Sequence, residues 1–409
     1  MKKIDIVWNV TYFRDVEFQL KSSKNSENIN NMFLIFDKPK QSINLEKVFA
    51  STSIKPHIIY KKELQQEMII PQQHVNSDYV IRLYSHVPDI DRVIEQAIST
   101  IEDKDAHVAR FVSSSIYKTS LFKIIPFHEF SLVSDAENNF YSLEEEFVVN
   151  RLRLKIVDKH GTIIEAKQPL KKKTLASPIV IVAYGGRSGS TWLQRVLNSH
   201  QDICVWGEPR LSIPAFNSFI INIKKNRLNT FVSLAIKAYR EAKSKDDVFI
   251  ATLPPDFNNN LFEEYKHIVT SYFHRTNHKY WGFKTVALHP SYLAFLLTLF
   301  PDACFIGIKR DKKNQMLSML KRKDWWNDIE AAYNDWAKNF DGLDIFMKFA
   351  REAGNVAPVF RYEELDPDKL CKLLEQQLQQ PEGSFSRDIS SKRIIDFKHS
   401  EELRRNKDV

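Results

Sequence analysis

Glycine is scarce in this sequence, with 10 residues among 409, and cysteine is scarcer still, with three. Cys204, Cys304 and Cys371 are far apart and odd in number, which argues against a disulfide framework or a zinc site. The longest apolar run, residues 292–300, is far shorter than the roughly 20 residues that span a bilayer. The amino terminus has no apolar segment of signal-peptide length. We therefore expect a cytoplasmic protein with reduced thiols, no bound metal and no integral membrane segment.

The charge balance is only moderately basic. There are 59 Lys and Arg residues against 51 Asp and Glu residues, which gives a formal net charge of +8. With 43% hydrophobic and 12% aromatic residues, the chain can build substantial cores, which excludes a disordered or low-complexity protein. The positive excess suits an anionic ligand, but charge alone does not choose between such a ligand, nucleic acid and a membrane surface.

The amino-terminal part, residues 1–170, alternates short β-rich runs with polar turns. It predicts a separate β-rich or α+β domain, with one amphipathic helix over residues 89–100. A glycine turn at Gly161 predicts a hairpin between residues 147–156 and 162–166. The other predicted strands are residues 4–12, 32–36, 57–60 and 79–84. We find no catalytic constellation in this part, and its role stays open.

Three consecutive lysines between two prolines mark residues 171–177 as a linker, so a second domain is predicted over 178–409. Short apolar runs alternate there with helical patterns, which predicts an α/β fold: a parallel sheet flanked by helices on both faces. The predicted strands are residues 179–184, 203–206, 280–284, 303–308 and 358–361. The predicted helices are residues 191–197, 231–242, 290–300 and 313–320. Ligands of such sheets bind beyond the carboxyl ends of the strands.

The three clustered glycines follow the first of these strands. Gly185, Gly186 and Gly189 lie between the strand and a helix, where backbone N–H groups form a cradle for an anion. Ser190 follows Gly189, whereas a nucleotide-triphosphatase loop would have lysine there, and Arg187 supplies the cation instead. The predicted feature is a P-loop-like phosphate loop without the usual lysine.

This stretch, Arg187-Ser-Gly-Ser-Thr-Trp-Leu193, resembles the 5′-phosphosulfate loop of sulfotransferases that use 3′-phosphoadenosine-5′-phosphosulfate (PAPS). The resemblance extends over about residues 178–391 and is nearest to the tyrosylprotein and carbohydrate branch. It implies that the loop binds PAPS and that an aromatic beside it stacks on adenine. The residues so implied are Gly186, Arg187, Ser188, Gly189, Ser190, Thr191 and Trp192.

A second motif agrees with that resemblance. The family binds the 3′-phosphate with an arginine after a strand and a serine eight residues later, which implies Arg310 and Ser318. Arg322 would lie on the same helical face as Ser318. The segment 359–365, VFRYEEL, is similar to the late R-Y-E-x-L strand of the family and implies that Tyr362 contacts the nucleotide. Further contacts are expected from Ser391 and Lys392.

The resemblance also implies catalytic residues. The segment 205–214 is similar to the G-E-x-x-R-x-x-P signature, in which the glutamate is the general base, here Glu208. Lys284 resembles the lysine that stabilises the transition state, and Arg187 is a second cation for the developing charge. The expected acceptor-binding residues are Arg210, whose position departs from the signature, Trp206, and His289, which is also an alternative base.

The sequence thus favours an enzyme that transfers a sulfuryl group from PAPS to a hydroxyl of a glycan, lipid or small metabolite, with PAP as product. No metal and no nucleic-acid partner are expected. An atypical nucleotide or metabolite kinase and a non-catalytic PAP- or carbohydrate-binding protein are the alternatives. Whether the chain forms a homo-oligomer through its amino-terminal domain stays open.

Overall fold

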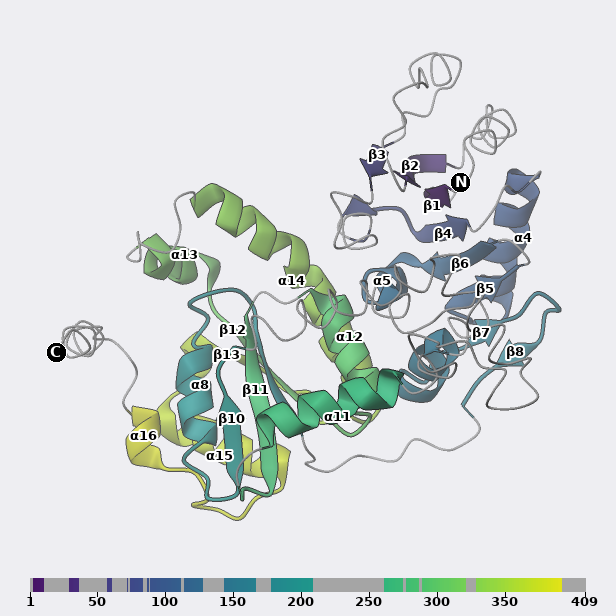
Figure 1. Ribbon diagram of the computed structural model, residues 1–409. Helices are drawn as coiled ribbons and strands as arrows, with labels where there is room; N and C mark the ends of the chain where they lie inside the picture. Colours follow the sequence, from purple (N-terminus) through teal and green to yellow (C-terminus); the bar gives the residue numbers. More distant parts are fainter. Residues whose placement is uncertain are drawn as a thin grey trace, which may run out of the picture.

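Two sheets organise the computed structural model (Figure 1). An 8-stranded sheet comes from the amino-terminal half and a 5-stranded sheet from the carboxyl-terminal half. The structure describes residues 3–10, 29–36, 57–60, 72, 74–83, 87, 89–111, 114–127, 143–166, 178–208, 261–274, 277–286, 289–320 and 329–391. The predicted linker 171–177 and the predicted helix 231–242 lie outside these ranges.

The 5-stranded sheet is entirely parallel, as the sequence predicts. Its strands, in spatial order, are β10 (Ile203–Trp206), β11 (Tyr280–Val286), β9 (Ile179–Ala183), β12 (Cys304–Lys309) and β13 (Val359–Arg361). The first strand in sequence, β9, is central. The phosphate loop therefore follows the middle strand, with two strand ends on either side of it.

Helices cover both faces of this sheet (Figure 1). Ile179 and Ile181 pack into a core with α8 (Ser190–Leu197) and α15 (Pro367–Leu378). Val180 and Val182 point to the opposite face, where the core includes α11 (Leu261–Phe273), α12 (Pro290–Leu299) and α14 (Ile329–Glu352). Because successive strand residues face opposite sides, a sheet buried on both faces needs an unbroken apolar run, which is what β9 provides.

Local signals in the sequence set where these helices begin. Gly189 precedes α8 and adopts a left-handed φ of 99°, which glycine tolerates best. His289 caps α12 by accepting the Ser291 N–H, and Asp366 caps α15 by accepting the Lys369 N–H. Asp311 likewise accepts the Asn314 N–H at the start of α13 (Lys312–Leu320). These starts place each helix directly after the strand end that precedes it.

The amino-terminal sheet is mixed, and it contains more parallel pairing than a β-rich domain would suggest. Its spatial order is β3 (His57–Tyr60), β2 (Ile29–Phe36), β1 (Ile4–Val10), β4 (Tyr79–Leu83), β6 (Ser114–Lys118), β5 (Val108–Arg110), β7 (Ile156–Val157) and β8 (Ile163–Ile164). The first four are mutually parallel, and β6 is antiparallel to both its neighbours. The helix α4 (Ile90–Asp103) confirms the predicted helix, with Asp89 as its cap.

One predicted strand in this half is wrong for most of its length. The hairpin exists as β7 and β8, with Gly161 at a φ of 77°, but the residues before it form a π-helix, η2 (Glu146–Arg151). Phe147, Val148 and Val149 are all buried there. A strand would send alternate residues to opposite faces, whereas the helix packs this apolar run against α12.

A single hydrophobic core joins the two halves. It runs from Val7 and Phe33 in the amino-terminal sheet through Phe147 to Phe295 and Phe346 on α12 and α14. The helices α5 (Thr119–Phe122) and α14 are also in contact. None of the helices in the described ranges combines the length and the apolar character that crossing a membrane requires. The three cysteines are free thiols, and Cys304 and Cys371 are buried.

Candidate functional site

The phosphate loop, residues 185–189, is a chain of unusual backbone conformations at the carboxyl end of β9. Gly185 and Gly189 have left-handed φ angles, and so does Arg187, at 64°, although it is not glycine. The N–H groups of Gly186, Ser188, Gly189 and Ser190 form no hydrogen bond with any described residue. The buried Ser188 hydroxyl also has no partner in the described part of the chain. Buried donors without partners at a helix start are the requirement for binding an anion.

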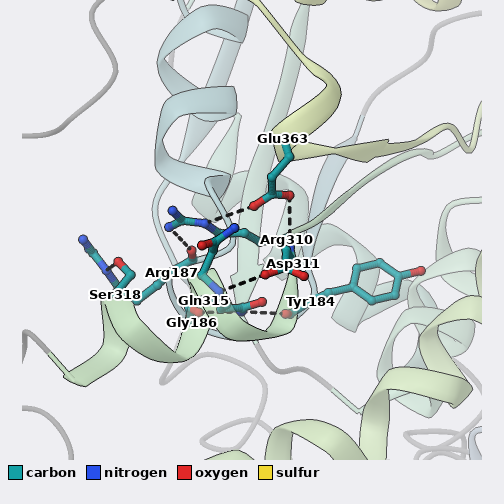
Figure 2. A network of polar contacts seen from close by, with 9 residues as sticks. Tyr184, Gly186, Arg187, Arg310, Asp311, Gln315, Ser318 and Glu363 are labelled. Carbon is teal, nitrogen blue, oxygen red and sulfur yellow. Dashed lines mark hydrogen bonds and ion pairs between the residues drawn. The ribbon is translucent and has the colours of Figure 1, made fainter.

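The predicted cationic residues converge on this loop. Arg187 Nε donates to the Ser318 hydroxyl at 3.2 Å, and Arg310 Nη1 donates to the Arg187 carbonyl at 3.3 Å (Figure 2). Arg310 lies at the carboxyl end of β12, and Ser318 lies on α13. The predicted pair Arg310 and Ser318 therefore meets the predicted loop cation Arg187, although the three residues come from three different elements.

Sequence reasoning missed the carboxylate that holds Arg310 in place. Glu363 lies 3.5 Å from Arg310 Nε with one oxygen and accepts the Asp311 N–H at 3.0 Å with the other (Figure 2). The neighbouring Tyr362 places its ring 4.9 Å from the Arg310 guanidinium carbon, a cation–π contact. Arg310, Asp311 and Glu363 also line part of a cavity of about 380 Å³ beyond the ends of β12 and β13.

Two further supports of the loop were also missed. Gln315 on α13 is buried, and its Nε2 donates to the carbonyls of Tyr184 at 3.0 Å and of Gly186 at 2.6 Å (Figure 2). The Tyr184 hydroxyl in turn donates to Asp344 on α14 at 2.9 Å. Burial and the negative charge of Asp344 raise the pKa of Tyr184 above its usual value, so this residue stays a neutral donor. Lys309 pairs with the same carboxylate.

The predicted catalytic residues Glu208 and Lys284 also lie together. Lys284 Nζ donates to the Thr191 hydroxyl at 3.1 Å and lies 3.5 Å from Glu208 Oε1. Lys284 is largely buried on β11, whereas the Glu208 side chain, just after β10, is 23% exposed. The ammonium group thus stands between the first turn of α8 and a carboxylate that solvent can reach. This arrangement can meet charge from the loop and accept a proton from a bound molecule.

The two aromatic residues predicted to contact the nucleotide pack on each other. Trp192 is only 3% exposed and makes an edge-to-face contact with Tyr362 at 5.5 Å between ring centroids. A methyl group added at Gly189 would lie 2.4 Å from the Tyr362 ring. Trp192 therefore belongs to the core on this face of the sheet, and stacking on a ligand would require it to leave that core.

The remaining predicted residues fall in different surroundings. His289 is buried as the cap of α12, and burial lowers its pKa to about 3, which makes it a weak base. Trp206 is 41% exposed at the end of β10, and its indole N–H donates to the Phe273 carbonyl at 2.7 Å. Outside the described residues lie Arg210, Arg322, Lys392 and the side chain of Ser391. Within the described ranges, no three His, Cys, Asp or Glu side chains gather as a metal site would require.

Comparisons with known proteins agree with this geometry at the level of a family. No curated protein matches the sequence. Among solved structures, the crystal structure of S. aureus TarS 1-349 matches with a TM-score of 0.26 and 10% identity, over 86% of this chain and 91% of that one. A similarity this low carries no conclusion. A sequence model described as the Sulfotransferase family matches residues 178–371, which include the phosphate loop, Glu208, Lys284, Arg310 and Ser318. Residues 178–371 are therefore a domain of the sulfotransferase family.

Proposed function

We propose that this domain transfers a sulfuryl group from PAPS to a hydroxyl of a glycan, lipid or small metabolite and releases PAP. The observation that carries the proposal is the meeting of Arg187, Ser318 and Arg310 beside a loop with unpaired N–H groups. A donor with two separate anionic groups on one nucleoside needs two anion sites in one cleft. The loop and the Arg310–Ser318 pair are two such sites.

Donor binding would use these two sites together. The loop N–H groups and the Ser188 hydroxyl would hold the 5′-phosphosulfate, because they are donors with no other partner among the described residues. Arg310 and Ser318 would hold the 3′-phosphate through charge-assisted hydrogen bonds. The Ser318 hydroxyl is now an acceptor for Arg187 and could donate to a phosphate oxygen at the same time, because a hydroxyl does both.

Glu208 and Lys284 would carry the transfer step. The acceptor oxygen forms a bond to sulfur while the bond between sulfur and the bridging oxygen of the donor breaks. Glu208 takes the proton of the acceptor hydroxyl, and Lys284 meets the negative charge that develops on the bridging oxygen. Glu208 as base follows the tyrosylprotein and carbohydrate branch of the family. A positioned base of this kind typically contributes about 10²- to 10⁴-fold to the rate.

Two variants test the proposal. PAP should raise the unfolding temperature of the wild-type protein, and Arg310→Ala should abolish most of this shift. Glu208→Gln should keep the shift and lower the turnover of labelled PAPS with an acceptor library by about 10²-fold or more. A shift with ATP and Mg²⁺ but none with PAP would refute the proposal in favour of a kinase. PAP binding without sulfated product from any acceptor would favour a binding protein.

A further inference from the structure

Gln315, like Ser318, is a residue of α13 that touches the phosphate loop, but it contacts the loop backbone instead of a side chain. Gln315 is 2% exposed, and its single amide nitrogen donates to the Tyr184 carbonyl, just before the loop, and to the Gly186 carbonyl within it. Both carbonyls are separated from Gln315 by about 130 residues in sequence. Gln315 therefore fixes the loop to a helix that begins far along the chain.

These contacts set the direction of the N–H groups in the loop. Within one planar trans peptide unit, the carbonyl and the following N–H point in opposite directions. Gln315 holds the Gly186 carbonyl, so the Arg187 N–H points away from α13. Arg310 holds the Arg187 carbonyl, so the Ser188 N–H points away from the Arg310 side. The two carbonyl contacts thus fix the peptide planes on either side of Arg187, and the Ser188 N–H, which has no partner among the described residues, can face an anion.

The same helix carries a part of the other anion site. Ser318 lies three residues after Gln315, a spacing that places both on one side of α13. Gln315 contacts the loop backbone, whereas Ser318 contacts the Arg187 side chain. The position of α13 therefore fixes both the orientation of the loop and the location of Ser318.

We propose that Gln315 is a positioning residue that orients the 5′-phosphosulfate loop and sets its distance from the 3′-phosphate site. This inference rests on the proposed function, because it assigns the two anion sites to the two ends of one donor. Gln315 touches neither end of the donor itself. Its loss should weaken binding of a 5′-phosphate while leaving recognition of a 3′-phosphate nearly intact.

The test uses the full-length protein and three nucleotides that separate the two sites. PAP carries both phosphates, 5′-AMP carries only the 5′-phosphate, and 3′-AMP carries only the 3′-phosphate. Gln315→Met removes both donated hydrogen bonds with little change in volume. We expect this variant to weaken the binding of PAP and 5′-AMP about tenfold and the binding of 3′-AMP less than twofold. Ser318→Ala serves as the matched control, because Ser318 contacts the Arg187 side chain and not the loop backbone; it should weaken binding of 3′-AMP and PAP and leave 5′-AMP much less affected.

The outcomes separate this inference from the proposed function. A wild-type protein that does not bind PAP would overturn the proposed function. If the wild-type protein binds PAP but Gln315→Met loses affinity for 5′-AMP and 3′-AMP equally, Gln315 has only a structural role and the inference is overturned. Unchanged affinity for both nucleotides in Gln315→Met would overturn it as well. Should Gln315→Met fail to fold, Gln315→Asn keeps a neutral amide but shortens the side chain by one methylene, which draws the nitrogen away from both carbonyls. The same selective loss of 5′-phosphate ligands is then expected.

Discussion

Gly189 offers a sharp test of how the loop is built, because two separate effects oppose a side chain there. Its φ of 99° is a left-handed conformation, and an added Cβ would lie 2.4 Å from the Tyr362 ring. In Gly189→Ala the backbone effect costs roughly 1–2 kcal/mol. The overlap adds about 1–3 kcal/mol, the usual cost of overfilling a packed site. Because Tyr362 must move and it contacts Arg310, PAP affinity should fall as well.

A matched control separates the two effects. Gly383 has a similar left-handed φ of 85°, but an added Cβ there would meet nothing within 4 Å. Gly383→Ala should therefore show the backbone cost alone, with unchanged PAP affinity. Thermal unfolding measures the stability difference, at about 2–4 °C per kcal/mol for a domain of this size, and a PAP titration measures the second effect. If Gly189→Ala matches Gly383→Ala in both, the close packing of loop and Tyr362 is refuted.

Three further predictions address other parts of the molecule. The folded pKa of His289, about 3, lies below its ordinary value of 6.5, so the unfolded chain binds the proton first and stability falls as pH drops below 6.5. His289→Asn keeps a capping oxygen but has no imidazole to titrate. The free energy of unfolding of the variant relative to wild type should therefore rise by about 2 kcal/mol when the pH is lowered from 7 to 5. Urea unfolding measures this difference, and an equal difference at both pH values would contradict the prediction. Trp206→Ala should raise the KM for the acceptor about three- to tenfold and leave the Kd for PAP unchanged, whereas an altered Kd alone would place Trp206 outside the acceptor site. A fragment of residues 178–409 should lack a sharp thermal transition, because it exposes the faces of α12 and α14 that the amino-terminal half buries; a cooperative, monomeric fragment would show that the shared core is dispensable.

The sequence predicts the parts of this molecule that depend on neighbouring residues. The strands β3 and β10 have the expected bounds, and the parallel sheet follows from apolar runs alternating with helical patterns. Arg187 was predicted from its place in the glycine turn, and the family resemblance implied Arg310 and Ser318; the structure brings the three residues into contact. Such motifs can be recognised in a sequence because the strand, the turn after it and the start of the next helix are contiguous.

The supports of the site are different, because each acts on a distant segment. Gln315 is one polar residue on a helix, and Glu363 is the glutamate of the segment 359–365, for which the motif itself gives no partner. Nothing near either residue in sequence indicates that their partners are 129 and 52 residues away. Trp192 illustrates the same limit, because its core partners include Tyr362, which comes from a remote strand end.

The shared core extends this argument to the whole chain. Three lysines and two prolines predict a boundary near residues 171–177, yet burial does not stop there, because the π-helix η2 packs on α12. The helix α14 links the two regions directly. Its Asp344 accepts the hydrogen bond of Tyr184 beside the phosphate loop, and its Phe349 contacts the ring of His107 at 6.3 Å in the amino-terminal half. Because one rigid helix carries both contacts, the amino-terminal half belongs to the framework that holds the site.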